Sequence, residues 1–117
     1  MDTSNKLLTE HNTSVIVLDF INALNTENFD LARQQLQDDM TFKGVMGERK
    51  GADVYIEDMK KMKFKYKVKK VFLDHEDVCL WYDIDMGQKT IFACGWYHLE
   101  DEKIKSFQVI FDPRPIL

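Results

Sequence analysis

The feature that most constrains the fold is a change in hydrophobic periodicity near residue 63. Before it, apolar residues recur three or four positions apart, as they do on one face of a helix. After it, apolar and polar residues alternate, which is typical of strands with one solvated face. Short turns separate these alternating segments. The chain is therefore predicted to form helices first and consecutive hairpin strands afterwards, an α+β fold whose helices cover one face of an antiparallel sheet.

Three helices are expected before this change. The first spans about residues 9–25, where four apolar side chains share one face: Val17, Phe20, Ile21 and Leu24. Asn28 can cap a short second helix that extends to about Leu36. The third helix covers residues 52–62, and it follows a glycine-rich turn or loop at residues 44–51.

Strands are expected in several places along the chain. A short one includes Met40 and Phe42. Longer ones follow the third helix, at about residues 63–69, 78–85, 90–99 and 104–111. Pro113 and Pro115 end the last strand, because proline has no backbone N–H to donate to a neighbouring strand.

Composition limits the class of protein. A chain of 117 residues without a repeat or linker has the size of one domain. The net charge of −4 argues against nucleic acid as a partner, since phosphate contacts need clustered cations. No apolar run approaches membrane-spanning length and the polar start has no signal-peptide pattern, so a cytoplasmic protein without membrane contact is expected. Cys79 and Cys94 have no histidine at ligand spacing, and neither a metal site nor a cofactor is predicted.

Three short segments occur in a characteristic order along the chain. The first comprises Phe20-Ile21-Asn22-Ala23-Leu24-Asn25, then Phe29-Asp30, then Asp38-Asp39-Met40-Thr41-Phe42. The second is Gly51, which opens a helix after a glycine-rich loop, and the third is Lys103-Ile104-Lys105-Ser106-Phe107. From about Ser14 to Phe111 the chain thus resembles the NTF2-like superfamily, which includes the SnoaL-like polyketide cyclases and the ketosteroid isomerases. The resemblance implies one domain over residues 1–117, with a cone-like, curved antiparallel sheet wrapped around a long N-terminal helix and two further helices (a cystatin-like roll).

The ketosteroid isomerase branch of this family relies on three polar groups in one apolar cavity. One aspartate is the base that transfers a proton of the substrate. A tyrosine and a second, protonated aspartate donate hydrogen bonds to the oxyanion that develops on the substrate. Carried over to this sequence, the tyrosine position falls on Phe20 and the base on Gly44. The second aspartate falls on Gly95, or on Cys94 or Trp96 if the strand register shifts. None of these residues supplies the required group, so isomerase activity by that machinery is not expected.

The resemblance also implies a pocket between the helices and the concave face of the sheet. The candidates for its walls are Phe20, Leu24, Tyr55, Met59, Tyr82, Tyr97, Phe107 and Phe111. Such a pocket is aromatic and apolar, and the hydroxyl groups of its tyrosines are the polar groups that can form hydrogen bonds with a ligand. The alternative is that these side chains simply fill the core, as apolar stripes usually do.

Asp83 and His98 are the remaining candidates for an acid or base. Strand alternation places Asp83 on the face opposite Tyr82, so it enters the pocket only if the register shifts by one residue. His98 lies on the same outer face as three aromatic side chains, Trp81, Phe92 and Trp96. A contiguous aromatic patch there indicates a partner surface. Because the family often dimerises through this face, a homodimer is expected.

Three hypotheses about function remain open. The protein binds a small, largely apolar ligand; or it is an enzyme of the same fold (isomerase, lyase or hydrolase) with different catalytic groups; or it is a dimeric interaction module. The first two require a cavity of roughly 300 Å³ or more that opens to solvent. The third predicts that Phe20, Phe107 and Phe111 fill the interior.

Overall fold

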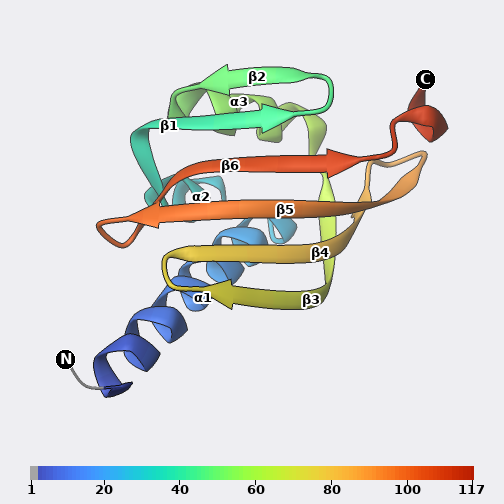
Figure 1. Cartoon of the computed structure of the whole chain (residues 1–117). Helices are drawn as coiled ribbons and strands as arrows, with labels where there is room; N and C mark the ends of the chain where they lie inside the picture. Colours follow the sequence, from blue (N-terminus) through green and yellow to red (C-terminus); the bar gives the residue numbers. More distant parts are fainter. Residues whose placement is uncertain (1–2) are drawn as a thin grey trace.

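The chain forms three helices and a six-stranded sheet, arranged as in Figure 1. The computed structural model describes residues 3–117, with side chains described from residue 12 onward. The helices are α1 (Thr3–Asn25), α2 (Phe29–Gln34) and α3 (Ala52–Met62). The strands are β1 (Leu36–Gly44), β2 (Gly47–Lys50), β3 (Lys65–Asp74), β4 (Asp77–Asp85), β5 (Thr90–Glu100) and β6 (Lys103–Phe111), and a 3-10 turn, η1, covers Arg114–Ile116. The α+β fold predicted from the sequence is confirmed.

The strand order across the sheet is β2-β1-β6-β5-β4-β3. Neighbouring strands are antiparallel except for β1 and β6, which run parallel. The expectation of a wholly antiparallel sheet is therefore wrong for this one pair. The reason is the crossover through α3, which carries the chain to the opposite edge of the sheet. Three successive hairpins then return β6 to the side of β1 in the same direction.

The sheet is curved, and the helices cover its concave face (Figure 1). The helix α1 packs against β3, β4 and β6, whereas α3 packs against β1 and β2. Register shifts interrupt the pairing of β1 with β6, of β3 with β4 and of β5 with β6. Such irregularities bend a strand and increase its local twist. None of the described helices is long and apolar enough to cross a bilayer.

The alternation in β4 and β5 places apolar side chains on the concave face, as predicted. Every second residue of both strands is buried, from Val78 to Ile84 and from Ile91 to Leu99. These side chains meet Val17 and Phe20 of α1, which are fully buried. The residues in between lie on the convex face, which we call the outer face.

The structure corrects several element boundaries. The segment expected to be a loop at residues 44–51 is mostly a β-hairpin, because the turn needs only the two residues between the paired Gly44 and Gly47. The second helix ends at Gln34, and Leu36 already belongs to β1. The predicted cap is confirmed: the side chain of Asn28 accepts a hydrogen bond of 3.2 Å from the backbone N–H of Leu31.

Candidate functional site

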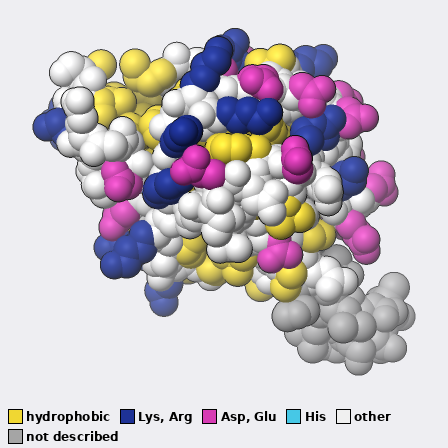
Figure 2. Space-filling model, turned by 180° about the vertical axis from the view of Figure 1, so that it is seen from behind, with side chains coloured by type: hydrophobic (Ala, Val, Ile, Leu, Met, Phe, Trp, Pro, Cys, Tyr) yellow, Lys and Arg dark blue, Asp and Glu magenta, His cyan; other side chains and the backbone are white. Residues whose placement is uncertain are grey.

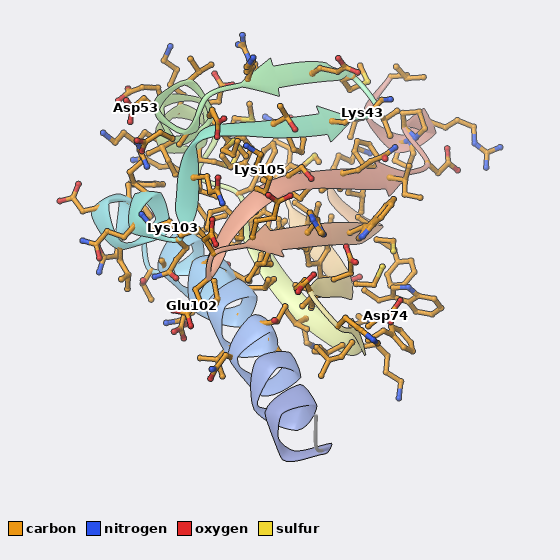
Figure 3. All side chains as sticks on the ribbon, turned by 60° about the vertical axis from the view of Figure 1, so that its left-hand side comes forward. Lys43, Asp53, Asp74, Glu102, Lys103 and Lys105 are labelled. Atoms are coloured by element: carbon orange, nitrogen blue, oxygen red, sulfur yellow. The ribbon has the colours of Figure 1, made fainter. Side chains whose placement is uncertain are left out.

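A cavity of about 270 Å³ lies between the concave face of the sheet and α3. Its walls come from every strand and from α3, and none of the side chains that line it carries a charge. Two methionines mark its opening, since Met46 is 67% exposed and Met62 is 47% exposed. Figure 2 shows hydrophobic side chains gathered at the end of the molecule where the β1–β2 turn and the C-terminus lie. Charged side chains such as Lys43 and Asp74 instead project outward from the sheet (Figure 3).

All four tyrosines of the chain line this one cavity. The hydroxyl oxygens of Tyr82 and Tyr97 are 2.7 Å apart, so one hydroxyl donates a hydrogen bond to the other. Both side chains are buried, and they come from the adjacent strands β4 and β5. The two hydroxyls are therefore buried polar groups in a wall that is otherwise apolar.

Gly95 makes the tyrosine pair possible. It lies opposite Leu80, between the rows of the sheet that hold Tyr82 and Tyr97. A Cβ atom at this position would overlap the hydroxyl oxygen of Tyr82 and would approach Cε1 of Tyr97 to 2.8 Å. The absent side chain thus leaves the space in which the Tyr82 hydroxyl crosses to its partner. The position at which the isomerase resemblance would place an aspartate is therefore occupied by a tyrosine hydroxyl from the neighbouring strand.

The other two tyrosines, Tyr55 of α3 and Tyr66 of β3, line other parts of the cavity. The Tyr66 hydroxyl donates a hydrogen bond to Sδ of Met59 at 3.7 Å, and it also interacts with the hydroxyl of Tyr55. The backbone of Tyr66 is held by the last residue of α1, Asn25, whose side-chain amide donates to the Tyr66 carbonyl at 2.8 Å and accepts from its N–H at 2.7 Å. Asn25 therefore fixes the edge strand β3, and with it the inward ring of Tyr66, to the end of the first helix.

Burial controls the ionisation of these phenols. Desolvation raises the pKa of Tyr66 to about 12, and it also raises the pKa of Tyr55, Tyr82 and Tyr97 well above the ordinary value of a phenol. The Tyr66 side chain is half-buried as a whole, but its hydroxyl points inward to Met59. All four groups stay neutral at physiological pH. They can donate and accept hydrogen bonds, but they do not act as bases.

Most of the predicted wall residues come together in this cavity. Six of the eight line it: Tyr55, Met59, Tyr82, Tyr97, Phe107 and Phe111. The other two, Phe20 and Leu24, are buried in α1 but do not line the cavity. Phe20 packs against rings that do, with its centroid 5.9 Å from that of Phe107 and 6.4 Å from that of Tyr97. The first helix thus supports the wall from behind, because it lies directly against the sheet.

The sequence interpretation missed the mouth and one tyrosine. Tyr66 shares the apolar face of β3, and this alternation was the signal that could have added it to the wall. Except for Met62, which shares the helical spacing of Tyr55 and Met59, the mouth residues carry no such signal, because they lie in turns where hydrophobic periodicity does not apply. They are Val45, Met46, Met62, Met86 and Ile116.

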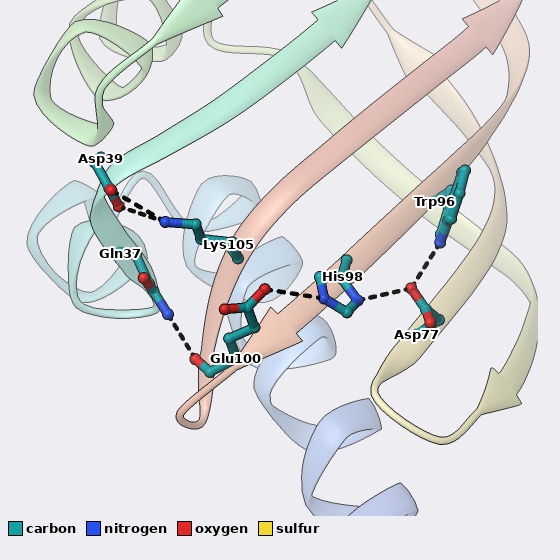
Figure 4. A network of polar contacts seen from close by, with 7 residues as sticks. All are labelled: Gln37, Asp39, Asp77, Trp96, His98, Glu100 and Lys105. Atoms are coloured by element: carbon teal, nitrogen blue, oxygen red, sulfur yellow. Dashed lines mark hydrogen bonds and ion pairs between the residues drawn. The ribbon is translucent and has the colours of Figure 1, made fainter.

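The two candidate acid–base residues lie on the outer face, away from the cavity. Asp83 forms an ion pair of 3.2 Å with Lys69. The His98 ring has its Nδ1 atom 3.0 Å from Oδ1 of Asp77 and its Nε2 atom 3.3 Å from Oε2 of Glu100, as Figure 4 shows. The same Asp77 oxygen accepts a hydrogen bond from Nε1 of Trp96 at 2.8 Å.

The sequence resemblance assigns the three isomerase groups to Phe20, Gly44 and Gly95. None of them brings a carboxylate or a hydroxyl of its own to the cavity. In the part of the chain whose side chains are described, no three histidine, cysteine or acidic side chains are placed to hold a metal ion. What the cavity offers chemically is therefore an apolar surface and neutral hydroxyl donors.

Known proteins share this sequence pattern and this fold. Residues 17–107 match the family model of the SnoaL-like domain. An NTF2-like protein of unknown function from Cytophaga hutchinsonii ATCC 33406 is 56% identical, with a TM-score of 0.88 over 89% of this chain and 93% of that one. A putative ketosteroid isomerase from Kribbella flavida DSM 17836 is 10% identical, with a TM-score of 0.82 over 88% of this chain and 79% of that one. A putative SnoaL-like polyketide cyclase from Jannaschia sp. CCS1 is 11% identical, with a TM-score of 0.81 over 92% and 90%.

The last two similarities concern the fold alone, because the sequences have diverged so far. No curated protein matches the sequence at a significant level. The family match covers most of the chain, and the match to the Cytophaga protein extends over nearly the whole of both chains. The chain belongs to the SnoaL-like domain family and has the NTF2-like fold.

Proposed function

We propose that this protein binds a small, neutral and largely apolar molecule in the tyrosine-lined cavity. The observation that carries the proposal is the convergence of all four tyrosines on one uncharged cavity. An apolar pocket with a few convergent polar groups is the usual form of a small-molecule site. The volume of about 270 Å³ lies just below the range typical of drug-sized ligands, which favours a compact ligand.

The cavity also favours binding over the alternative of an enzyme with other catalytic groups. Such chemistry would depend on Asp83, His98 or a tyrosine, and Asp83 and His98 are engaged in polar contacts on the outer face. The phenols inside remain protonated because burial raises their pKa. The third hypothesis, a filled interior, fits the structure less well, because Phe107 and Phe111 line the space without closing it.

A neutral fluorescent probe, 1-naphthol, tests the proposal. We expect it to bind the wild-type protein and to lose binding when Val109→Phe fills the cavity, because Val109 lines it. The matched control is Ile110→Phe, one residue along the same strand, whose side chain is 58% exposed on the outer face. Equal binding by both variants, or no binding by the wild type, would refute the proposal.

We further propose that two copies of the chain pair through the outer face. Trp81, Phe92 and Trp96 are 44%, 54% and 54% exposed there, and the rings of Trp81 and Phe92 are 5.8 Å apart. Phe72 and Ile110 extend this apolar patch. Half-exposed side chains of this size leave an apolar area on the order of 500 Å², enough for the core of a standard interface.

The two tryptophans of the chain both lie in this patch, so their fluorescence reports the pairing. We expect the emission to shift to shorter wavelength as protein concentration rises, in step with dimer mass from sedimentation equilibrium. Phe92→Arg should remove both effects, whereas Val54→Arg on the exposed side of α3 should remove neither. A wild-type protein that stays monomeric at high concentration would contradict the proposal.

We also infer that the protein acts in the cytoplasm. Cys79 and Cys94 are free thiols that are partly exposed. Thiols of this kind persist in reducing compartments, whereas oxidising ones favour disulfides. Localisation of the tagged full chain by fractionation tests this inference.

A further inference from the structure

The mouth of the cavity is apolar and rich in methionine. We call Val45, Met46, Met62 and Met86 the methionine mouth; they come from the β1–β2 turn, the end of α3 and the β4–β5 turn. Val45, Met46 and Met62 are 39%, 67% and 47% exposed. Methionine has a flexible, polarisable side chain that adapts to apolar partners of varied shape. The hydrophobic surface of this site therefore continues outward beyond the cavity.

The cavity itself is too small to account for that surface. A volume of about 270 Å³ corresponds to roughly nine non-hydrogen atoms, if each takes about the 30 Å³ of a water molecule. The methionine mouth lines the open end of this cavity, but Met46 and Met62 also expose much of their surface to solvent, and a ligand that covers this outer surface must extend beyond the cavity. Such a ligand is longer than the enclosed space and passes through its opening.

The polar groups are unevenly distributed along this path. The hydroxyl of Tyr66, the least buried of the four tyrosines, donates to Met59 and also interacts with Tyr55. Deep inside, Tyr82 and Tyr97 have two hydroxyl protons between them. One proton forms the hydrogen bond between the two hydroxyls, and the other hydroxyl proton has no acceptor among the described residues. A ligand oxygen beside this pair would accept that proton. The deep end of the cavity thus suits an oxygen atom, and the outer end suits hydrocarbon.

Charge restricts the nature of the oxygen group. No lysine, arginine or histidine lines the cavity, so a carboxylate or phosphate would lose its hydration without gaining a counter-ion. The cation next to Ile116, Arg114, is paired with Asp112 at 2.6 Å and points to solvent. The group that enters first is therefore neutral.

We propose that the ligand is a neutral single-chain amphiphile, with its hydroxyl or carbonyl oxygen at Tyr82 and Tyr97 and its hydrocarbon tail leaving through the methionine mouth. This inference rests on the proposed binding function and specifies the ligand class and its orientation. The first eight or so carbons lie within the cavity. Later carbons pack against Met46 and Met62.

Displacement of 1-naphthol by hexanol, octanol, decanol and decanoate tests the inference. Each fully buried methylene adds about fourfold to affinity, so the two extra methylenes of decanol would add about fifteenfold over octanol; because the mouth covers the tail only in part, we expect a gain of at least about fivefold. The double variant Met46→Ser/Met62→Ser removes apolar wall at the open end of the cavity, so it should weaken decanol binding more than octanol binding and lose most of the gain from octanol to decanol. Val54→Ser, an exposed residue of α3 outside the cavity lining, is the control and should keep the gain.

The outcomes separate the two proposals. Binding of 1-naphthol without displacement by any alcohol would overturn the ligand class and leave the binding function intact. Two results would refute the proposed path of the tail through the methionine mouth. One is a wild-type affinity that stops rising at octanol, and the other is a double variant in which decanol still binds more tightly than octanol by the wild-type factor. If decanoate bound as tightly as decanol, the proposal that the ligand's polar group is neutral and enters the cavity first would be wrong. Absence of 1-naphthol binding would refute the binding function itself.

Discussion

Replacing Gly95 by alanine should destabilise the protein, although the same change in most strands has the opposite effect. Alanine restricts the unfolded chain more than glycine does and stabilises a compatible strand by roughly 0.5–1 kcal/mol. Here the added methyl group would overlap the Tyr82 hydroxyl and would lie 2.8 Å from Cε1 of Tyr97. The sign of the effect therefore tests whether the tyrosine pair depends on this glycine.

The magnitude follows from two losses. Moving Tyr82 aside breaks the 2.7 Å hydrogen bond to Tyr97 and leaves buried hydroxyls unpaired, which costs about 1–3 kcal/mol. Overpacking of the interior adds about 1–3 kcal/mol. After the gain from alanine is subtracted, we expect the free energy of unfolding to fall by roughly 1–5 kcal/mol, a large part of the ~5–15 kcal/mol typical of a domain.

Urea denaturation, followed by far-ultraviolet circular dichroism, measures this change as a lower midpoint with an unchanged slope. A double-mutant cycle with Tyr82→Phe identifies the cause, because phenylalanine removes the overlapping oxygen but keeps the ring. Gly95→Ala should cost about 1–2 kcal/mol less in the Tyr82→Phe background. A neutral or stabilising Gly95→Ala, or an equal cost in both backgrounds, would refute the reasoning.

Two other features of the cavity lead to further expectations. Because burial raises the pKa of every tyrosine, absorbance at 295 nm should show no phenolate in the folded protein at pH 10, the ordinary pKa of tyrosine. The tyrosines of the unfolded chain lose their hydroxyl protons from about pH 10 upward, whereas those of the folded chain keep them. The free energy of unfolding should therefore be unaffected by these groups below pH 10 and should fall as the pH rises toward the folded pKa of about 12 for Tyr66. Phenolate absorbance of the folded protein at pH 10 would show that the tyrosines are not buried. Asn25→Ala should lower the free energy of unfolding by about 1–3 kcal/mol and weaken 1-naphthol binding, because it removes both hydrogen bonds to the Tyr66 backbone. Asn22→Ala, at an exposed position of the same helix, should change neither quantity, and equal effects of the two variants would show that Asn25 has no special role.

Much of the site could be inferred because strand alternation is a local property. A period of two decides which side chains share a face, so Tyr82 and Tyr97 could be assigned to the interior and Asp83 to the exterior. The isomerase groups could be excluded on residue type alone, since neither phenylalanine nor glycine carries the needed oxygen. The capping role of Asn28 was also predictable, because a cap depends only on residues within one turn of a helix.

Other features depend on contacts between segments that are distant in the sequence. The hydrogen bonds of Asn25 to Tyr66 join residues 41 positions apart, and the methionine mouth gathers two turns and a helix end. The parallel pairing of β1 with β6 follows from the path of the chain around α3, which no local pattern encodes.

The α+β fold, the faces of its strands and the absence of charged residues among the predicted wall positions could all be read from residue types and their spacing. Three features required the folded chain: Phe20 packs behind the wall, Gly95 makes room for the Tyr82 hydroxyl, and a cavity remains between the sheet and α3. The physical reason is that hydrophobic periodicity records which side of an element avoids water. Whether the space on that side is filled or left open depends on how side chains from several elements pack together.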